Sequence, residues 1–235
     1  MLSWDFLLNK LAVSFYTELF MQFTGLLVVF TYLTGDKKTK PMGYLALLAI
    51  ASVGQSWITD YAILSIRNSS AGRTIERISI DIYLVIEVTC CLSFIRFHLQ
   101  SMKHKKILLF VNVLFTTCVI IHRSLNPYPT IDNWHIMTLE NILIIFGTFF
   151  YFFDLFNYDY KMGLARTPSL CAISGMAILF CATTPFFLFF DYLRKNHSQF
   201  ANSLYAINNI SYSLLFITFI IAILFDKRQL SKAAN

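Results

Sequence analysis

Long apolar segments alternate with short polar ones along almost the whole chain. Each apolar segment approaches the roughly 20 residues that an α-helix needs to cross a hydrocarbon core of roughly 30 Å. The pattern therefore predicts an all-α membrane protein, a bundle of seven transmembrane helices, with no room for a separate soluble domain. We expect a single transmembrane domain over residues 1–235, with spans at residues 11–33, 42–66, 75–97, 106–122, 137–158, 168–192 and 203–225.

Polar and proline-containing segments separate the predicted helices. Residues 35–41 (GDKKTKP) end the first helix and start the second, and residues 67–73 (RNSSAGR) form a polar loop. The fourth span is the weakest, because it is short and contains Asn112 and two adjacent threonines. Pro185 lies inside the sixth span, where it is expected to kink the helix or to end its regular hydrogen bonding.

Composition supports a membrane location and excludes one class of partner. Hydrophobic residues make up 57% of the chain and charged residues 14%, against about 25% charged in soluble domains. The net charge of +6 lies in loops and tails, and no basic run is interleaved with aromatic residues as a nucleic-acid surface would need. The first apolar segment is too long for the core of a cleavable signal peptide, so we expect it to remain as the first span.

Lys and Arg residues predict which end of the bundle faces the cytoplasm. If the N-terminus lies outside, the inner segments hold 12 of these residues and the outer segments hold 7. Because positive charge favours the inner side, we expect the N-terminus outside and the C-terminus inside, in a bacterial inner membrane. Arg67, Arg73 and Arg77 would lie on the outer side and oppose this arrangement.

Ionisable side chains within the predicted spans are the main clue to function, because each is costly in hydrocarbon unless it is paired or hydrated. At about 1.5 Å per residue, four carboxylates fall in the outer half of the bilayer and Glu87 falls near its centre. Amide side chains occupy the same outer layer. The predicted ligand-binding residues are Glu18, Gln22, Asp60, Asp81, Glu87, Glu140, Asn208 and Asn209.

Three interpretations of this asymmetry stay open. The polar groups could line a cavity that opens outward between the helices, or they could form a path for protons or cations. They could also only join helices through interhelical hydrogen bonds, and Arg77, four residues before Asp81, could simply pair with it. Glu87 could likewise be a proton switch, a ligand anchor, or a hydrogen-bond partner for a Tyr or Asn on another helix.

Motifs for catalysis or cofactor binding are scarce. No HxxH or HExxH spacing, Walker loop or GxSxG elbow occurs, so we predict no metal and no cofactor, although His135 could join Glu140 and Asp60 at a metal site. The seventh span has no Lys, which excludes a retinal Schiff base like that of the rhodopsins. In an enzyme, Glu87, Glu140, Asp60 and Asp81 would supply acid and base, as carboxylates do in integral-membrane terpene cyclases.

Four stretches together resemble a known group of membrane proteins. They are IYLVIE at residues 82–87, TLENILIIFGTFFY at 138–151, PSLCAISGMAILF at 168–180 and NNISYSLLF at 208–216. Their order and spacing resemble those of small seven-span membrane proteins common in Bacteroidota, which are similar to the membrane input regions of sensor histidine kinases. The resemblance implies a sensory or signalling module, and it aligns Glu87, Glu140, Gly175 and Asn208 without giving them roles. No kinase follows the seventh span, so we expect any output to pass to a partner.

The leading hypothesis from the sequence is a signal-input module. It would bind a small or lipidic ligand from the outer side of the membrane and act through a membrane or cytoplasmic signalling partner. An intramembrane enzyme that uses buried carboxylates is the first alternative, and a transporter or pore-forming effector is the second. Few charged groups fall in the inner half of the spans, which disfavours the second alternative. The sequence leaves the ligand, the partner and the oligomeric state open.

Overall fold

Seven α-helices make up the described part of the chain in the computed structural model, which covers residues 4–35, 39–66, 70–125, 134–157, 168–196 and 198–234. Side chains are described at residues 15–35, 39–59, 72, 74–125, 134–157, 168–190, 192, 193, 196 and 206–228. The helices are α1 (Trp4–Leu33), α2 (Lys40–Ile66), α3 (Ser70–His98), α4 (Met102–Leu125), α5 (Trp134–Asn157), α6 (Pro168–Asn196) and α7 (Ser198–Ala234). All seven are long and apolar enough to cross a membrane, which confirms the predicted all-α, multi-pass membrane protein.

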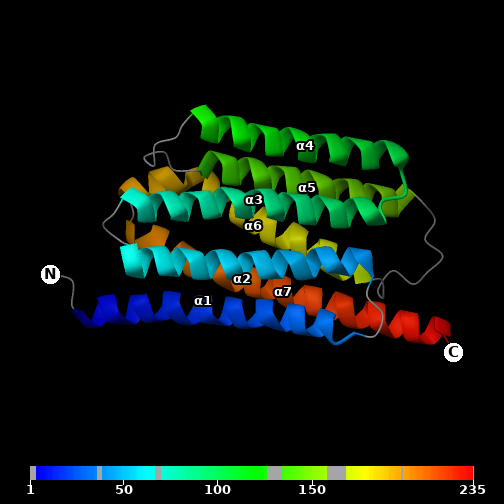
Figure 1. Cartoon of the computed structure of the whole chain (residues 1–235), viewed down its shortest axis with the longest axis horizontal. Coiled ribbons are helices and arrows are strands. Elements are labelled where there is room, and N and C mark those ends of the chain that lie inside the picture. The colour runs from blue at the N-terminus through cyan, green and yellow to red at the C-terminus, as the bar shows by residue number, and fades with distance from the viewer. Residues whose placement is uncertain are drawn as a thin grey trace.

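The helices run side by side and alternate in direction (Figure 1). Helices α1, α3, α5 and α7 begin at one end of the bundle, which we call the N-end, and they finish at the opposite end, which we call the C-end. The two termini of the chain therefore point to opposite ends, as an odd number of crossings requires.

Six of the helices form a closed ring, and α4 lies outside it. In order around the ring, the packed neighbours are α1, α2, α3, α5, α6 and α7, and α7 returns to α1. Within the described residues, helix α4 packs chiefly against α3 and α5, and Figure 1 shows it at the edge of the bundle. Its buried residues are Leu108, Phe115 and Val119, while its other large apolar side chains are mostly exposed.

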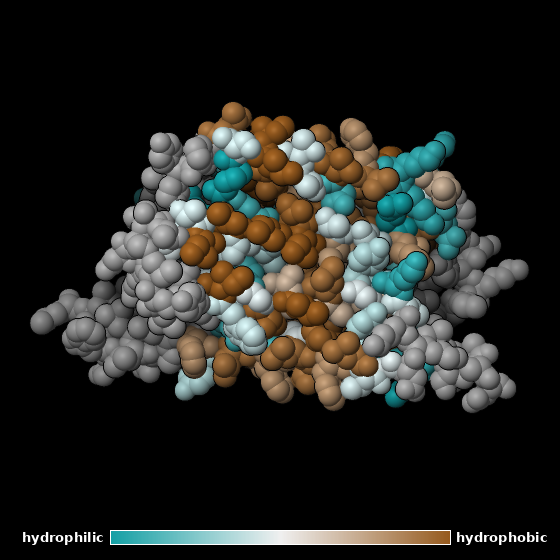
Figure 2. Space-filling model, in the orientation of Figure 1, coloured by the Kyte–Doolittle hydropathy of each residue, from teal (hydrophilic) through white to brown (hydrophobic). Residues whose placement is uncertain are grey.

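Apolar side chains cover the outside of the bundle as well as its core. Brown, hydrophobic residues dominate the middle of the face in Figure 2, where α2, α3 and α4 lie. Phe110 is 68% exposed and Ile82 is 55% exposed. Exposure of such large apolar side chains is unfavourable in water but not in hydrocarbon. The exposed apolar belt is thus the surface that meets lipid.

The helices extend beyond the predicted spans at several ends. Helix α4 has 24 residues, against a prediction of residues 106–122, because Ser101 caps its start. The Ser101 carbonyl accepts a hydrogen bond from the Lys105 N–H at 3.1 Å, and the Ser101 hydroxyl lies 3.4 Å from the His104 N–H. Helix α3 begins at Ser70, inside the predicted polar loop, and α7 continues to Ala234. Hydropathy marks the hydrocarbon-crossing part of a helix, and polar turns outside that part remain helical.

Pro185 does not end α6. The helix continues from Pro168 to Asn196, so the predicted effect of Pro185, a kink or a break in regular hydrogen bonding, does not divide α6 into two helices. Pro185 has no N–H to donate to the carbonyl four residues earlier, and that loss is confined to one helical bond. The preceding Thr183 and Thr184 hydroxyls donate to the Leu179 and Phe180 carbonyls at 3.0 and 2.5 Å, which supports the backbone in this turn.

Candidate functional site

A polar cavity of about 250 Å³ lies inside the ring of six helices. Its lining side chains come from every helix of the ring, and α4 contributes none. The cavity extends from the N-end toward the middle of the bundle, because Glu76 lies near the start of α3 whereas Glu87 lies halfway along it. The side chains with polar atoms in this lining include Glu18, Gln55, Ser56, Glu76, Tyr83, Glu87, Trp134, Glu140, Asn208, Asn209 and Tyr212.

Two carboxyl groups from different helices meet at the inner end of this cavity. Glu87 of α3 is 1% exposed and Glu140 of α5 is 2% exposed, and their side chains are hydrogen-bonded to each other. An ionised carboxylate can only accept hydrogen bonds, so a bond between two carboxyls requires a proton on one of them. The pair is therefore a place where the protein can hold one proton between two helices.

Two tyrosines complete the environment of Glu87. The Tyr212 hydroxyl of α7 donates to Glu87 Oε1 at 2.9 Å, and Tyr83 of α3 shares a further side-chain hydrogen bond with Glu87. Four polar side chains from α3, α5 and α7 are thus joined in one buried network. Such a network specifies one arrangement of these helices, because every unpaired member would carry the cost of its lost solvation.

Three buried atoms around the cavity have no hydrogen-bond partner within the described residues. They are the Trp134 Nε1, which is a donor, and Glu140 Oε1 and Asn208 Oδ1, which are acceptors. A buried polar atom left unsatisfied costs about 1–3 kcal/mol, so three around one cavity are unusual. All three side chains line the same cavity, so water or a bound molecule with both donors and acceptors would complete the site.

A chain of hydrogen bonds between α1 and α2 forms the wall nearest to Glu18. The Ser56 hydroxyl donates to Glu18 Oε1, and Gln22 Nε2 donates to Ser56 Oγ at 2.9 Å. Trp57 Nε1 in turn donates to Gln22 Oε1 at 3.1 Å. The carboxylate of Glu18 is therefore fixed in position by α2 rather than swinging freely.

The charge of the cavity lining is one-sided. Glu18, Glu76, Glu87 and Glu140 all contribute to it, and no Lys, Arg or His is among the described residues that line it. A low-dielectric cavity strengthens the field of such groups. The cavity accordingly favours a cationic or donor-rich guest over an anionic one.

Most of the predicted binding residues converge. Glu18, Glu87, Glu140, Asn208 and Asn209 line the one cavity, and Gln22 contacts it indirectly through Ser56. The Asp60 side chain lies outside the described residues, and so does the part of the predicted His135 metal site that depends on it. Among the residues that the structure describes, no group of three or more His, Cys, Asp or Glu side chains is arranged to hold a metal ion.

Asp81 is a correction to the predicted set. It faces α4 rather than the cavity, where its carboxylate forms an ion pair with Arg123 and accepts a hydrogen bond from Arg123 Nε at 2.5 Å. The reason is helical geometry, since six residues separate Asp81 from Glu87 and six residues turn a helix by about 240° beyond one full turn. Depth along the membrane placed the two side chains in neighbouring layers, but they point to different sides of α3.

Several lining residues were not among the predicted ones. Tyr83 and Tyr212 bind Glu87, and Trp134 and Glu76 contribute polar atoms to the lining. Helical spacing could have identified Tyr212, because it lies four residues after Asn208 and so shares its face. Trp134 carried no such signal, because its position at a helix start is typical of an interfacial anchor.

Another buried carboxylate, Asp154 at the C-end, has a structural role. Asp154 Oδ2 accepts hydrogen bonds from the backbone N–H groups of Gln100 and Ser101 at 2.9 Å each, and Oδ1 pairs with His104 Nδ1 at 2.7 Å. These bonds join α5 to the turn between α3 and α4. With both oxygens occupied, Asp154 is not a candidate binding group.

Comparison of the chain with protein-family models, with curated proteins and with solved structures finds no match.

Proposed function

We propose that this chain is a membrane signal-input protein that binds a small or lipidic ligand in the cavity within the helix ring. The observation that carries the proposal is the set of three unpartnered buried atoms around one acidic cavity, next to a pair of hydrogen-bonded carboxyls. In this proposal the N-end faces the outside of a bacterial inner membrane, so the cavity receives its ligand from the outer side. The resemblance of the chain to sensor-kinase input regions points the same way.

The lining indicates the chemistry of the ligand. Glu140 Oε1 and Asn208 Oδ1 need hydrogen-bond donors, and the Trp134 N–H needs an acceptor. An amine and a hydroxyl on one small head group meet those needs, and an amine also meets the excess of carboxyls. A phosphate or carboxylate group would instead be repelled by the acidic lining.

Helix α7 is the element through which binding would act at the opposite end. It carries Asn208, Asn209 and Tyr212 at the cavity and continues without interruption to Ala234. Near the C-end, Lys227 Nζ donates to the Thr31 carbonyl at 2.5 Å, and Asp226 accepts from the Thr39 hydroxyl at 2.8 Å. A ligand that binds Glu140 would perturb the carboxyl pair to which Tyr212 is hydrogen-bonded through Glu87, and so bias the position of α7 against α1 and a signalling partner.

An intramembrane enzyme is the second candidate, and one specific observation favours it. Glu87 and Glu140 face each other as a pair that holds one proton, which is the arrangement needed for an acid and a base in one site. A transporter is less favoured, because Phe94, Phe216 and Phe219 are fully buried on the C-end side of the pair and form an apolar layer.

Titration with ethanolamine, which carries both an amine and a hydroxyl, tests these functions in lipid nanodiscs. Saturable quenching of Trp fluorescence, lost in Trp134→Phe, would show binding in the cavity. We expect Glu140→Gln to weaken it about tenfold, because a hydrogen bond to a charged group contributes about 1.5–3 kcal/mol. Asp81→Asn is the matched control, a carboxyl on the other side of α3, and is expected to bind as the unmodified protein does.

The fate of the probe separates the candidates. A sensor returns ethanolamine chemically unchanged and does not carry it across a liposome membrane, while an enzyme converts an accepted substrate and a transporter produces flux. Absence of any saturable signal, or equal affinity in Glu140→Gln and the unmodified protein, would contradict binding at this cavity.

A further inference from the structure

We propose that the ligand is a long-chain amine-bearing amphiphile that enters the cavity sideways from the lipid, between α2 and α3. Tyr83 and Gln55 form the gate, the amine reaches Glu140, and the hydrocarbon chain stays in a groove on the outside of the bundle. The inference rests on the proposed binding function and specifies the class of ligand and its route.

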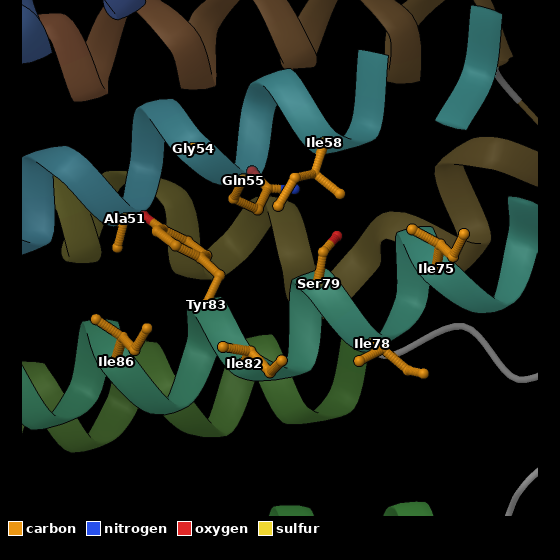
Figure 3. A pocket seen from close by; sticks show the side chains of 10 residues that line it. All are labelled: Ala51, Gly54, Gln55, Ile58, Ile75, Ile78, Ser79, Ile82, Tyr83 and Ile86. Carbon is orange, nitrogen blue, oxygen red and sulfur yellow. The ribbon is translucent and has the colours of Figure 1, made fainter. Parts of the chain in front are cut away.

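The groove is an apolar hollow of about 420 Å³ between α2 and α3. Figure 3 shows the side chains of Ile58, Ile75, Ile78, Ile82 and Ile86 along it. Several of these are exposed on the surface of a protein whose seven helices are long and apolar enough to cross a membrane, so hydrocarbon is the medium that covers this face.

Gly54 keeps the groove open. A Cβ atom added at this glycine would meet no heavy atom within 4 Å, so the space over this turn of α2 is unfilled. By contrast, a Cβ at Gly25 or Gly147 would lie within 3 Å of a packed neighbour. A lipid chain is the occupant whose shape and polarity fit a hollow of this kind, because it needs no hydrogen-bond partner there.

Tyr83 and Gln55 line both the groove and the polar cavity. In Figure 3, Tyr83 reaches from α3 toward α2 and ends near Ala51 and Gln55. The aromatic ring of Tyr83 lines the groove, whereas its hydroxyl belongs to the Glu87 network inside the ring of six helices. Gln55 is held by its own bond, with Nε2 donating to Thr59 Oγ1 at 2.9 Å. These two side chains are the partition between lipid and the carboxyl pair.

Continuity of an apolar groove with an acidic cavity selects one class of guest. Hydrocarbon fits the groove, and an amine fits a cavity lined by Glu18, Glu76, Glu87 and Glu140 with no described Lys, Arg or His. A fatty acid matches the groove but carries the wrong charge for the cavity. A water-soluble amine matches the cavity but gains nothing from the groove.

Binding of dodecylamine, dodecanoic acid and ethanolamine, each to the protein in nanodiscs, tests the inference through Trp134 quenching. We expect dodecylamine to bind at least about tenfold more tightly than ethanolamine, since burial of two methylenes already gives that factor, and dodecanoic acid to give no signal. Gly54→Phe, which fills the groove, should remove this advantage, while Val113→Phe, an equal addition on the lipid-facing side of α4, should keep it.

The outcomes distinguish the route from the function. If Gly54→Phe still binds ethanolamine normally but loses the preference for dodecylamine, the lateral route is supported. If dodecylamine binds equally well to Gly54→Phe and to the unmodified protein, the route is overturned while the cavity remains a binding site. If ethanolamine itself fails to bind, the proposed function falls first. Gly54→Ala, expected to fold and bind normally, shows whether bulk rather than loss of glycine is responsible.

Discussion

At the scale of single residues, the candidate site depends on a proton shared by two carboxyl groups and on two tyrosines that are hydrogen-bonded to one of them. Glu87 and Glu140 come from helices that cross the membrane independently, yet they form one hydrogen-bonded unit. The Tyr212 hydroxyl occupies Glu87 Oε1, which leaves Glu140 Oε1 as the acceptor that faces the cavity. In the proposed function, the free carboxyl oxygen that a ligand meets is therefore the one on Glu140.

Tyr212→Phe tests this role. Loss of the hydroxyl leaves a buried acceptor on Glu87 without its donor, and we expect the free energy of unfolding to fall by about 1 kcal/mol. Thermal unfolding in a mild detergent measures the change. Tyr16→Phe, at a tyrosine that is 66% exposed, is the control and should unfold at the unmodified temperature. A Tyr212→Phe protein as stable as the control would show that the hydrogen bond contributes nothing to the fold.

The sequence predicted the members of this site better than their pairings. The free-energy cost of placing a carboxyl group in hydrocarbon identified Glu18, Glu87 and Glu140, because such a group must be paired or hydrated there. The same rule selected Asp81, which satisfies that cost with Arg123 on the other side of α3. The depth of a side chain in the membrane can be predicted by counting residues along the helix. The face of the helix that points into the bundle cannot be predicted in this way, because both lipid and the protein core are apolar.

At the scale of helices, α6 and α7 approach each other closely at Gly175. A Cβ at Gly175 would collide with the Thr218 side chain, so this glycine lets the two backbones pack tightly. Small residues serve the same purpose in other membrane bundles, where close packing replaces the hydrophobic effect. Through this contact, α6 supports the helix that carries Asn208, Asn209 and Tyr212.

Gly175→Ala is expected to destabilise the protein by about 1–3 kcal/mol, the usual cost of forcing extra volume into a packed contact. Thr218→Ala, which removes the obstructing hydroxyl and methyl, should restore part of that loss when combined with it. Gly54→Ala provides the comparison, because a methyl there enters open space. Unfolding temperatures of the three variants give the order, and equal temperatures for Gly175→Ala and Gly54→Ala would contradict the close approach.

Helix ends show the other limit of reading a membrane sequence. Hydropathy found all seven crossings, but α4 begins at Met102 rather than at residue 106. Its start is fixed by Ser101, and Asp154 holds the turn before it from α5, more than 50 residues away in the sequence. Apolar length reports the thickness of the hydrocarbon, while caps and long-range bonds set where a helix stops.

At the scale of the whole molecule, the arrangement of helices around the ring was beyond prediction. Segment lengths give the number of crossings, but the neighbours follow from packing, and α4 could have been a ring member on its apolar pattern alone. Its position outside leaves α3 in contact with α2, α4, α5 and α6. Helix α3 is consequently the one that carries Glu87 inward, Asp81 toward α4, and four of the five isoleucines of the groove toward lipid.

In the proposed function, the orientation of the bundle decides which compartment supplies the ligand. Among described residues, Lys40, Lys103, Lys105, Lys106, Lys227 and Arg228 lie toward the C-end, which places that end in the cytoplasm if the positive-inside rule holds.

Single cysteines, introduced into a variant without the native ones, test this in spheroplasts. Ser124 lies in the last turn of α4, at the N-end of the bundle, and we expect Ser124→Cys to react with a membrane-impermeant maleimide in intact spheroplasts. Met102 lies in the first turn of α4, at the C-end of the bundle, and we expect Met102→Cys to react only after lysis. Both positions are exposed on the same helix, so they differ in side alone. The reverse pattern would open the polar cavity toward the cytoplasm, and a ligand arriving from outside would then have to cross the apolar layer of Phe94, Phe216 and Phe219.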